Sequence, residues 1–156
     1  MKHYTRTLSL FLFISFAFSQ TQLGSDIDGE AQGDYSGWSV SMNSAGDRVA
    51  IGAANNAGTG SNAGHVRIYE YSNSSWTQLG SDIDGEAQGD YSGTSVSMNS
   101  AGDRVAIGAE NNDGTASNAG HVRVYEYSNS SWTQLGSDID GEAANDYSGW
   151  SVSMNS

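Results

Sequence analysis

The sequence predicts an all-β fold built from repeated antiparallel units. A segment of 56 residues occurs twice with few changes and then begins a third time. Stretches within it alternate polar and apolar residues, and the connections between them are rich in Gly, Asn, Asp and Ser, which favour turns. The chain has 20 glycines and no segment rich in Leu, Lys and Glu, so its composition disfavours helices.

The repeat divides the chain after residue 20 into two full copies and a partial one. Residues 21–76 (first copy) and 77–132 (second copy) align without a gap. They differ at five positions: Trp38/Thr94, Ala54/Glu110, Ala57/Asp113, Gly60/Ala116 and Ile68/Val124. The third copy, 133–156, differs from the first at Ala144 and Asn145 and stops where the others continue into AGDRVAIGA. We therefore expect an N-terminal fragment of a longer protein, truncated in its third unit.

Each copy contains four strand-like segments. In the second copy they span 75–83, 93–98, 104–109 and 121–127. Thr94, Val96 and Met98 alternate with serines, as in a strand with two different faces. The segment RVAIGA is apolar or small on both faces, which predicts a strand buried on both sides. In HVRVYEY the valines share one face, and Arg123 and the tyrosines share the other.

Four antiparallel strands in a repeat of this length predict the blades of a β-propeller. A parallel β-helix is the alternative, but its coils are shorter and would leave strands over. A closed propeller needs roughly four to eight blades. The chain is therefore expected to form an incomplete propeller.

The order of the motifs resembles the FG-GAP repeat, the blade unit of the integrin α-subunit propeller, in its bacterial secreted or cell-surface variants. An aromatic-glycine opening (35–40) is followed by a turn (43–47), an AIGA strand (50–53) and a GHVRIY strand (64–69). The resemblance implies adhesion or ligand recognition. Two motifs depart from the family, because Ser-Gly replaces Phe-Gly and Gly-Ala-Ala replaces Gly-Ala-Pro.

The calcium loop of that family is not carried over. It has a D-x-D-x-D-G pattern before the AIGA strand, whereas this chain has NSAGD, with Asp47 or Asp103 as its single carboxylate. Calcium takes six to eight oxygen ligands, usually with several carboxylates.

A second acidic cluster, DIDGEAQGD, is the candidate metal site. Its acids in the second copy are Asp82, Asp84, Glu86 and Asp90, equivalent to Asp26, Asp28, Glu30 and Asp34 in the first copy. Calcium is the ion that such oxygen ligands would hold, and no other cofactor is indicated. The alternative is an acidic turn in which Asp84 and Gly85 reverse the chain and the other acids are solvated. The third copy keeps the acids although neighbouring residues change, which favours a role for them.

His65 and His121 each follow a glycine at the start of the last predicted strand. Because no other histidine or cysteine lies at a metal-ligating spacing, we expect them to be hydrogen-bonding residues at a strand end. The tyrosines of this strand are expected to pack between blades, and an aromatic patch for a glycan or peptide is the alternative. Trp76 and Trp132 are expected to pack in the core of a blade or between blades.

Residues 1–19 have the layout of a secretory signal peptide. Lys2, His3 and Arg6 precede the apolar run 8–18, and small residues precede a cut before Gln20. The alternative is an uncleaved anchor, although the run is short for a membrane span. We expect a secreted or cell-surface protein with no membrane insertion after cleavage.

The charge of the remaining chain excludes some partners. Four arginines against eighteen acidic residues leave a net charge of −14 after the signal. Such a surface repels nucleic acid and anionic membranes, so no nucleic-acid partner is expected. The chain has no cysteine, and its stability must come from packing and repetition rather than disulfides.

The sequence predicts a non-catalytic extracellular module that binds an extracellular protein or glycan. No nucleophile elbow, catalytic triad or phosphate loop is present, and near-identical units do not supply one asymmetric active site, so no catalytic residue is assigned. Three of the five differences between the copies fall in 54–60 and 110–116, as when a recognition loop diversifies, or as in neutral drift. The alternatives are a secreted enzyme with a catalytic domain beyond residue 156 and a purely structural display scaffold.

Overall fold

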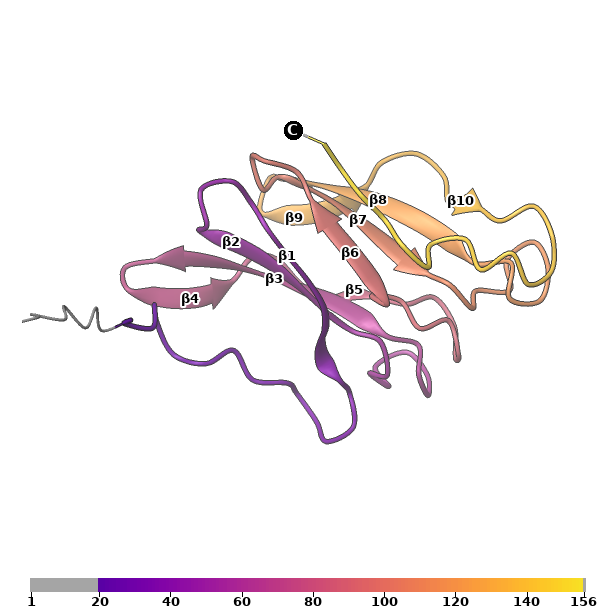
Figure 1. The fold of residues 1–156 in the computed structure, drawn as a ribbon, viewed down its shortest axis with the longest axis horizontal. Coiled ribbons are helices and arrows are strands. Elements are labelled where there is room, and N and C mark those ends of the chain that lie inside the picture. The colour runs from indigo at the N-terminus through magenta and orange to yellow at the C-terminus, as the bar shows by residue number, and fades with distance from the viewer. Residues whose placement is uncertain (1–19, 156) are drawn as a thin grey trace, which may run out of the picture.

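The computed structural model describes residues 20–155 and shows two antiparallel β-sheets (Figure 1). The first sheet consists of β1 (Ser36–Met42), β2 (Arg48–Ala53), β3 (His65–Ser72), β4 (Ser75–Gln78) and β5 (Ile83–Asp84). The second consists of β6 (Ser95–Met98), β7 (Arg104–Ala109), β8 (His121–Ser128), β9 (Ser131–Gln134) and β10 (Ile139–Asp140). The all-β prediction is confirmed. The predicted signal peptide lies outside the described residues.

Within residues 20–155 there is no helix with the length and apolar character needed to cross a membrane.

Both sheets have the same topology and register. In the first, β1, β2, β3 and β4 follow one another as antiparallel neighbours, and β5 pairs with the beginning of β3. Val49 lies opposite Tyr69, as Val105 lies opposite Tyr125 in the second sheet. RVAIGA forms β7, in which every residue except Arg104 is buried, so this prediction is confirmed.

The predicted strand 75–83 is divided in the structure, which corrects the sequence-based boundary. β4 pairs with the end of β3 and β5 with its beginning, and the chain leaves the sheet between them. Gly80 has a φ of 81° in this connection, and a Cβ on it would lie 2.8 Å from Cδ1 of Trp132. Glycine is therefore required both for the backbone conformation and for the close approach of the tryptophan. The predicted strand 93–98 likewise begins at Ser95 in the structure, because Tyr91 and Thr94 close a turn before it.

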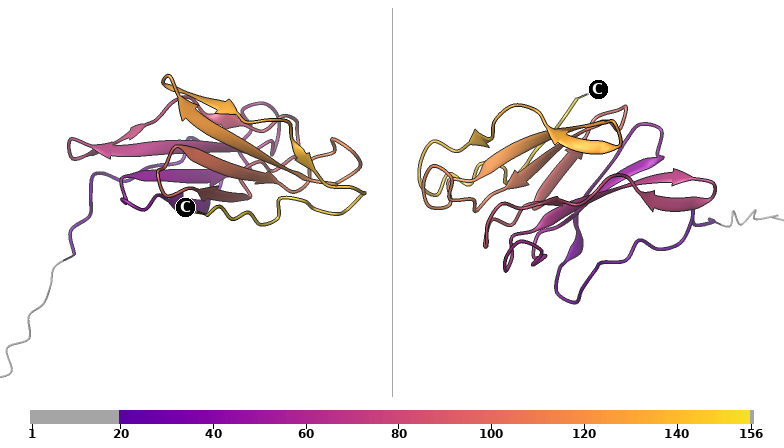
Figure 2. Two further views of the ribbon diagram at one scale, coloured as in Figure 1. Left: turned by 90° about the horizontal axis from the view of Figure 1, so that it is seen from above. Right: turned by 180° about the vertical axis from the view of Figure 1, so that it is seen from behind.

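The two sheets pack face to face, with β1 against β6 (Figures 1 and 2). The core between them contains Ala50, Val66, Ile68 and Ile83 of the first sheet and Val96, Met98, Val105, Ile107 and Tyr125 of the second. Two hydrogen bonds set the register: Ser39 Oγ donates to the Gly93 carbonyl at 2.7 Å, and the Met98 N–H donates to Ser41 Oγ at 2.9 Å. Consecutive repeats thus share one apolar interface.

The same interface begins again on the far side of the second sheet. Ser95 Oγ donates to the Gly149 carbonyl at 2.7 Å, and the Met154 N–H donates to Ser97 Oγ at 2.9 Å. Residues 148–155 therefore lie against β6 as the equivalent part of the second copy lies against β1. The same pair of hydrogen bonds therefore joins successive repeats.

Candidate functional site

The acids of the candidate metal site do not gather at one point. Asp90 is 3% exposed, and its Oδ2 accepts hydrogen bonds from the Ala87 N–H at 2.9 Å and Asn112 Nδ2 at 3.0 Å. Asp34 makes the equivalent bonds in the first copy, to Ala31 and Asn56. These two carboxylates hold a turn and the loop beside it.

Asp84 has a different environment. It lies in β5 opposite His65, and its backbone carbonyl accepts a hydrogen bond from Arg123 Nη2 at 2.7 Å. The Asp28 carbonyl accepts the same bond from Arg67 at 2.8 Å. Asp28 and Asp84 therefore bind the arginines through their main-chain carbonyls, and both residues are exposed.

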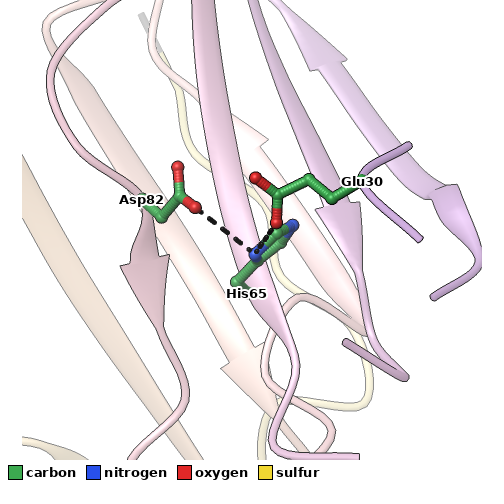
Figure 3. A group of neighbouring side chains, drawn as sticks. All are labelled: Glu30, His65 and Asp82. Carbon is green, nitrogen blue, oxygen red and sulfur yellow. Dashed lines mark ion pairs between the residues drawn. The ribbon is translucent and has the colours of Figure 1, made fainter. Parts of the chain in front are cut away.

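Asp26 accepts a hydrogen bond from Gln22 Nε2 at 2.7 Å and lies in neither of two histidine clusters. The other candidate acids, Glu30, Asp82 and Glu86, approach the two histidines. Nδ1 of His65 lies 3.8 Å from Glu30 Oε2 and 3.7 Å from Asp82 Oδ2, as Figure 3 shows. We call these three residues the first cluster. In the second cluster, Nδ1 of His121 lies 3.9 Å from Glu86 Oε2 and 3.6 Å from Asp138 Oδ2.

Each cluster is assembled from three parts of the chain. In the second cluster the glutamate comes from the connection before the sheet, the histidine from the first residue of β8, and the aspartate from the connection after β9. Asp82 and Glu86 flank β5 and belong to different clusters. The part of the chain between β4 and β6 therefore contributes one acid to each cluster.

The histidines are buried and the acids partly exposed. The His121 side chain is 1% exposed, whereas Glu86 is 46% and Asp138 27% exposed. Neither ring nitrogen of His121 has a hydrogen-bond partner within residues 20–155. Burial lowers the pKa of His121, the positive charge of Arg123 adds to this effect, and the nearby carboxylates oppose it. Its environment therefore favours the neutral form of the imidazole.

An arginine orients the glutamate of each cluster. Arg123 Nη1 lies 3.6 Å from Glu86 Oε1, the oxygen that does not face the histidine. The guanidinium lies over the Tyr125 ring at 5.7 Å from its centroid. Because Nη2 also binds the Asp84 carbonyl, the arginine is fixed on three sides and holds Glu86 beside His121.

The histidines were not predicted from the sequence as part of a site. They were expected to be hydrogen-bonding residues at a strand end, whereas the His121 ring has no such bond in the described part of the chain. In the structure, the pairing of His65 with Asp84 brings the DIDGE segment to the histidine. That pairing depends on the division between β4 and β5, which the residue pattern did not predict.

The turn between β1 and β2 is closed by an asparagine. Asn43 Oδ1 accepts hydrogen bonds from the N–H groups of Asp47 at 3.1 Å and Arg48 at 3.0 Å. Asn43 Nδ2 donates to Asp47 Oδ1 at 2.7 Å. The single carboxylate of the loop thus binds an amide.

Most of the positions that differ between copies lie at one end of the sheets, where β6 and β8 begin and β7 ends. We call this the variable edge; in the second sheet and the connection after it, it comprises Thr94, Glu110, Asp113, Ala116, Ala144 and Asn145. The Asn145 N–H donates to the Ser117 carbonyl at 2.9 Å, which joins the third-copy turn to the loop before β8. The Thr94 side chain favours the charged form of Glu110. Val124, at the fifth differing position, lies within β8.

Contacting residues at this edge change together. A Cβ on Gly60 would lie 3.0 Å from the Cβ of Gln88, and in the next repeat the two positions are Ala116 and Ala144. Trp38 and Ala54 of the first copy become Thr94 and Glu110 in the second, where the threonine favours the charged form of the glutamate. The variation at the edge is thus compatible with an unchanged backbone.

Each tryptophan contacts residues near the start of its own copy. Trp132 Nε1 donates to the Leu79 carbonyl at 2.7 Å, and its ring lies 5.1 Å from that of Tyr127. Trp76 makes the equivalent bond to Leu23 at 2.9 Å. These aromatic residues tie each connection to the sheet that follows it.

No protein-family model matches this chain, and no curated protein matches it either.

Proposed function

We propose that the chain is a non-catalytic extracellular repeat module for adhesion or ligand recognition, and that its sheets are blades of an FG-GAP-like β-propeller. The four-stranded antiparallel path β1-β2-β3-β4 supports the blade assignment. The identical register of the two sheets supports a regular array.

The observation that carries the proposal is the variable edge. Hydrogen bonds and the core are repeated almost unchanged, while four of the five differences between the full copies, and both differences of the third copy, lie at this edge. Loops on a rigid scaffold are where repeat proteins place their binding residues. Asp113 and Asn145 are exposed there and available to a partner. The proposed partner is an extracellular protein or glycan.

Binding of the chain to panels of glycans and of extracellular matrix proteins tests the proposal. The decisive variant is Thr94→Trp, Glu110→Ala, Asp113→Ala and Ala116→Gly, which gives the second copy the edge residues of the first. Because each new residue already occurs at the same place in the first copy, the variant is compatible with the fold.

Affinity for the ligand found in the panels is expected to change by about tenfold or more, as for residues at the centre of a binding surface. The matched control is Thr133→Ser in β9, at the opposite end of the sheet, which should bind as the wild type does. If the chain bound no member of either panel, the result would contradict a recognition function and favour a structural display scaffold. Equal binding by the edge variant would place the binding surface elsewhere and contradict the role of the variable edge.

A further inference from the structure

We infer that the first and second clusters are binding sites for a first-row divalent transition metal ion such as Zn²⁺. Each site offers one imidazole nitrogen and two carboxylate oxygens. This proposal goes beyond the recognition function and does not depend on it.

The three donor atoms are close enough to share one ion. In each cluster they all lie within 4.8 Å of one another, and Nδ1 of His121 is 3.6 Å from one carboxylate oxygen and 3.9 Å from the other. Zinc binds nitrogen and oxygen at about 2.0–2.2 Å, so neighbouring ligands of a tetrahedral site are separated by roughly 3.4 Å. Small rotations of the two partly exposed acids bring the donors to that spacing.

The imidazole supplies the independent evidence for a ligand. A fully buried polar ring normally has a hydrogen-bond partner, because burial removes its bonds to water. His121 has none within residues 20–155, and its Nδ1 is directed at the two carboxylates. A metal ion at Nδ1 would provide the partner that this nitrogen lacks.

The chemistry of the donors selects the class of ion. Imidazole nitrogen suits zinc, copper and nickel, whereas calcium takes six to eight oxygens. Two carboxylates and the neighbouring Arg123 leave a local charge of −1, which favours a divalent cation. Because Glu86 is 46% exposed, the ion has access from solvent, and water can complete the coordination.

The location of the sites gives the metal a structural consequence. In each cluster the glutamate lies in the segment before the sheet, whereas the aspartate lies between two short strands of the sheet that contains the histidine. A bound ion would therefore fasten the preceding segment to this sheet. In the second cluster that segment follows β5 of the first sheet, so the ion would also join the two sheets.

The test counts the zinc bound by the full chain after equilibrium dialysis, with calcium as the comparison ion. We expect two zinc ions per chain, one per cluster, and no competition from calcium. Glu86→Gln should weaken one site at least tenfold and leave the other intact, because removing a ligand costs no less than removing a residue that orients one. Glu30→Gln with Glu86→Gln should abolish both sites.

The control is Asp113→Ala, which removes an exposed acid outside the clusters and introduces the residue of the first copy. It should retain two ions. Circular dichroism verifies the fold of each variant, and visible absorption after cobalt substitution reports whether nitrogen and oxygen ligands surround the ion.

The proposal is overturned if the wild type retains no zinc after dialysis, or if the double glutamine variant still binds two ions. Equal loss of zinc from Asp113→Ala and Glu86→Gln would also overturn it, because the metal would then follow surface charge. Retention of two ions by the control and one by Glu86→Gln supports the assignment.

Discussion

Asn43 determines the geometry of the turn between β1 and β2. Its side chain is buried, and its amide makes three hydrogen bonds to Asp47 and Arg48. Asn43→Ala leaves these groups without partners, which typically costs about 1–3 kcal/mol for a buried group. We expect the free energy of unfolding in urea to fall by that amount. Ser44→Ala, at the exposed neighbouring position, should change it little; an equal loss in both variants would contradict this role of the asparagine.

Glu110 is predicted to make stability depend on pH. Burial raises its pKa, against the effect of the Thr94 side chain, which lowers it. Folding stability is therefore highest below the unfolded pKa of about 4.3, where the side chain is protonated in both states. It falls as the pH rises through the folded-state pKa. Glu110→Gln should therefore be more stable than the wild type at neutral pH, with a difference that shrinks toward pH 4.

Thermal unfolding of both proteins across this pH range provides the measurement. Thr94→Ala removes the side chain that favours the charged form of Glu110. In this background, the stability gained by Glu110→Gln at neutral pH should be larger. A difference that stays constant with pH would show that the carboxyl group is not responsible.

At the scale of elements, strands with a strong local pattern could be predicted from the sequence. RVAIGA has apolar or small residues at every position after the arginine, because both faces of β7 are covered. The division of SWTQLGSDI was not predictable in this way, because the local pattern does not report that Trp132, distant in the sequence, lies against Gly80. Periodicity reports which face of a strand is buried but not which distant residue covers it.

The same limit explains the candidate site. The acids of DIDGEAQGD were recognised as a group, but their proximity in sequence does not place them together. Asp82 and Glu86 meet histidines of different repeats. Long-range pairing such as that of β5 with β3, which the local sequence does not specify, brings each histidine between two acids.

Gly52 tests the close contact between elements of neighbouring repeats. A Cβ on this residue of β2 would overlap the carbonyl oxygen of Gly93 and Oγ of Ser39. Gly52→Ala must therefore separate the backbones, and overpacking of this kind costs about 1–3 kcal/mol or more. Gly58→Ala, whose new Cβ would first meet a side-chain oxygen at 3.1 Å, is the matched control. Chemical denaturation should show a large loss for the first and a small one for the second; similar losses would contradict the close contact.

At the scale of the whole molecule, the central claim is that successive repeats stack through one apolar interface. Equivalent residues differ in exposure only because one copy has a neighbour on that face. Ile83 is 5% exposed and Ile139 58%, although both begin the same short strand. The energetic role of such a residue should therefore follow its position in the stack rather than its type.

Met98 and Met42 test this claim most directly. They occupy the same position in the two copies, but Met98 is 6% exposed in the interface and Met42 is 50% exposed. Met98→Ala is expected to lower the free energy of unfolding by about 2–5 kcal/mol, as for a buried methionine. Met42→Ala should lower it by less than about 1 kcal/mol. Urea unfolding of the two variants measures both values: a large loss at Met98 alone supports the stacked interface, and equal losses at the two positions would contradict it.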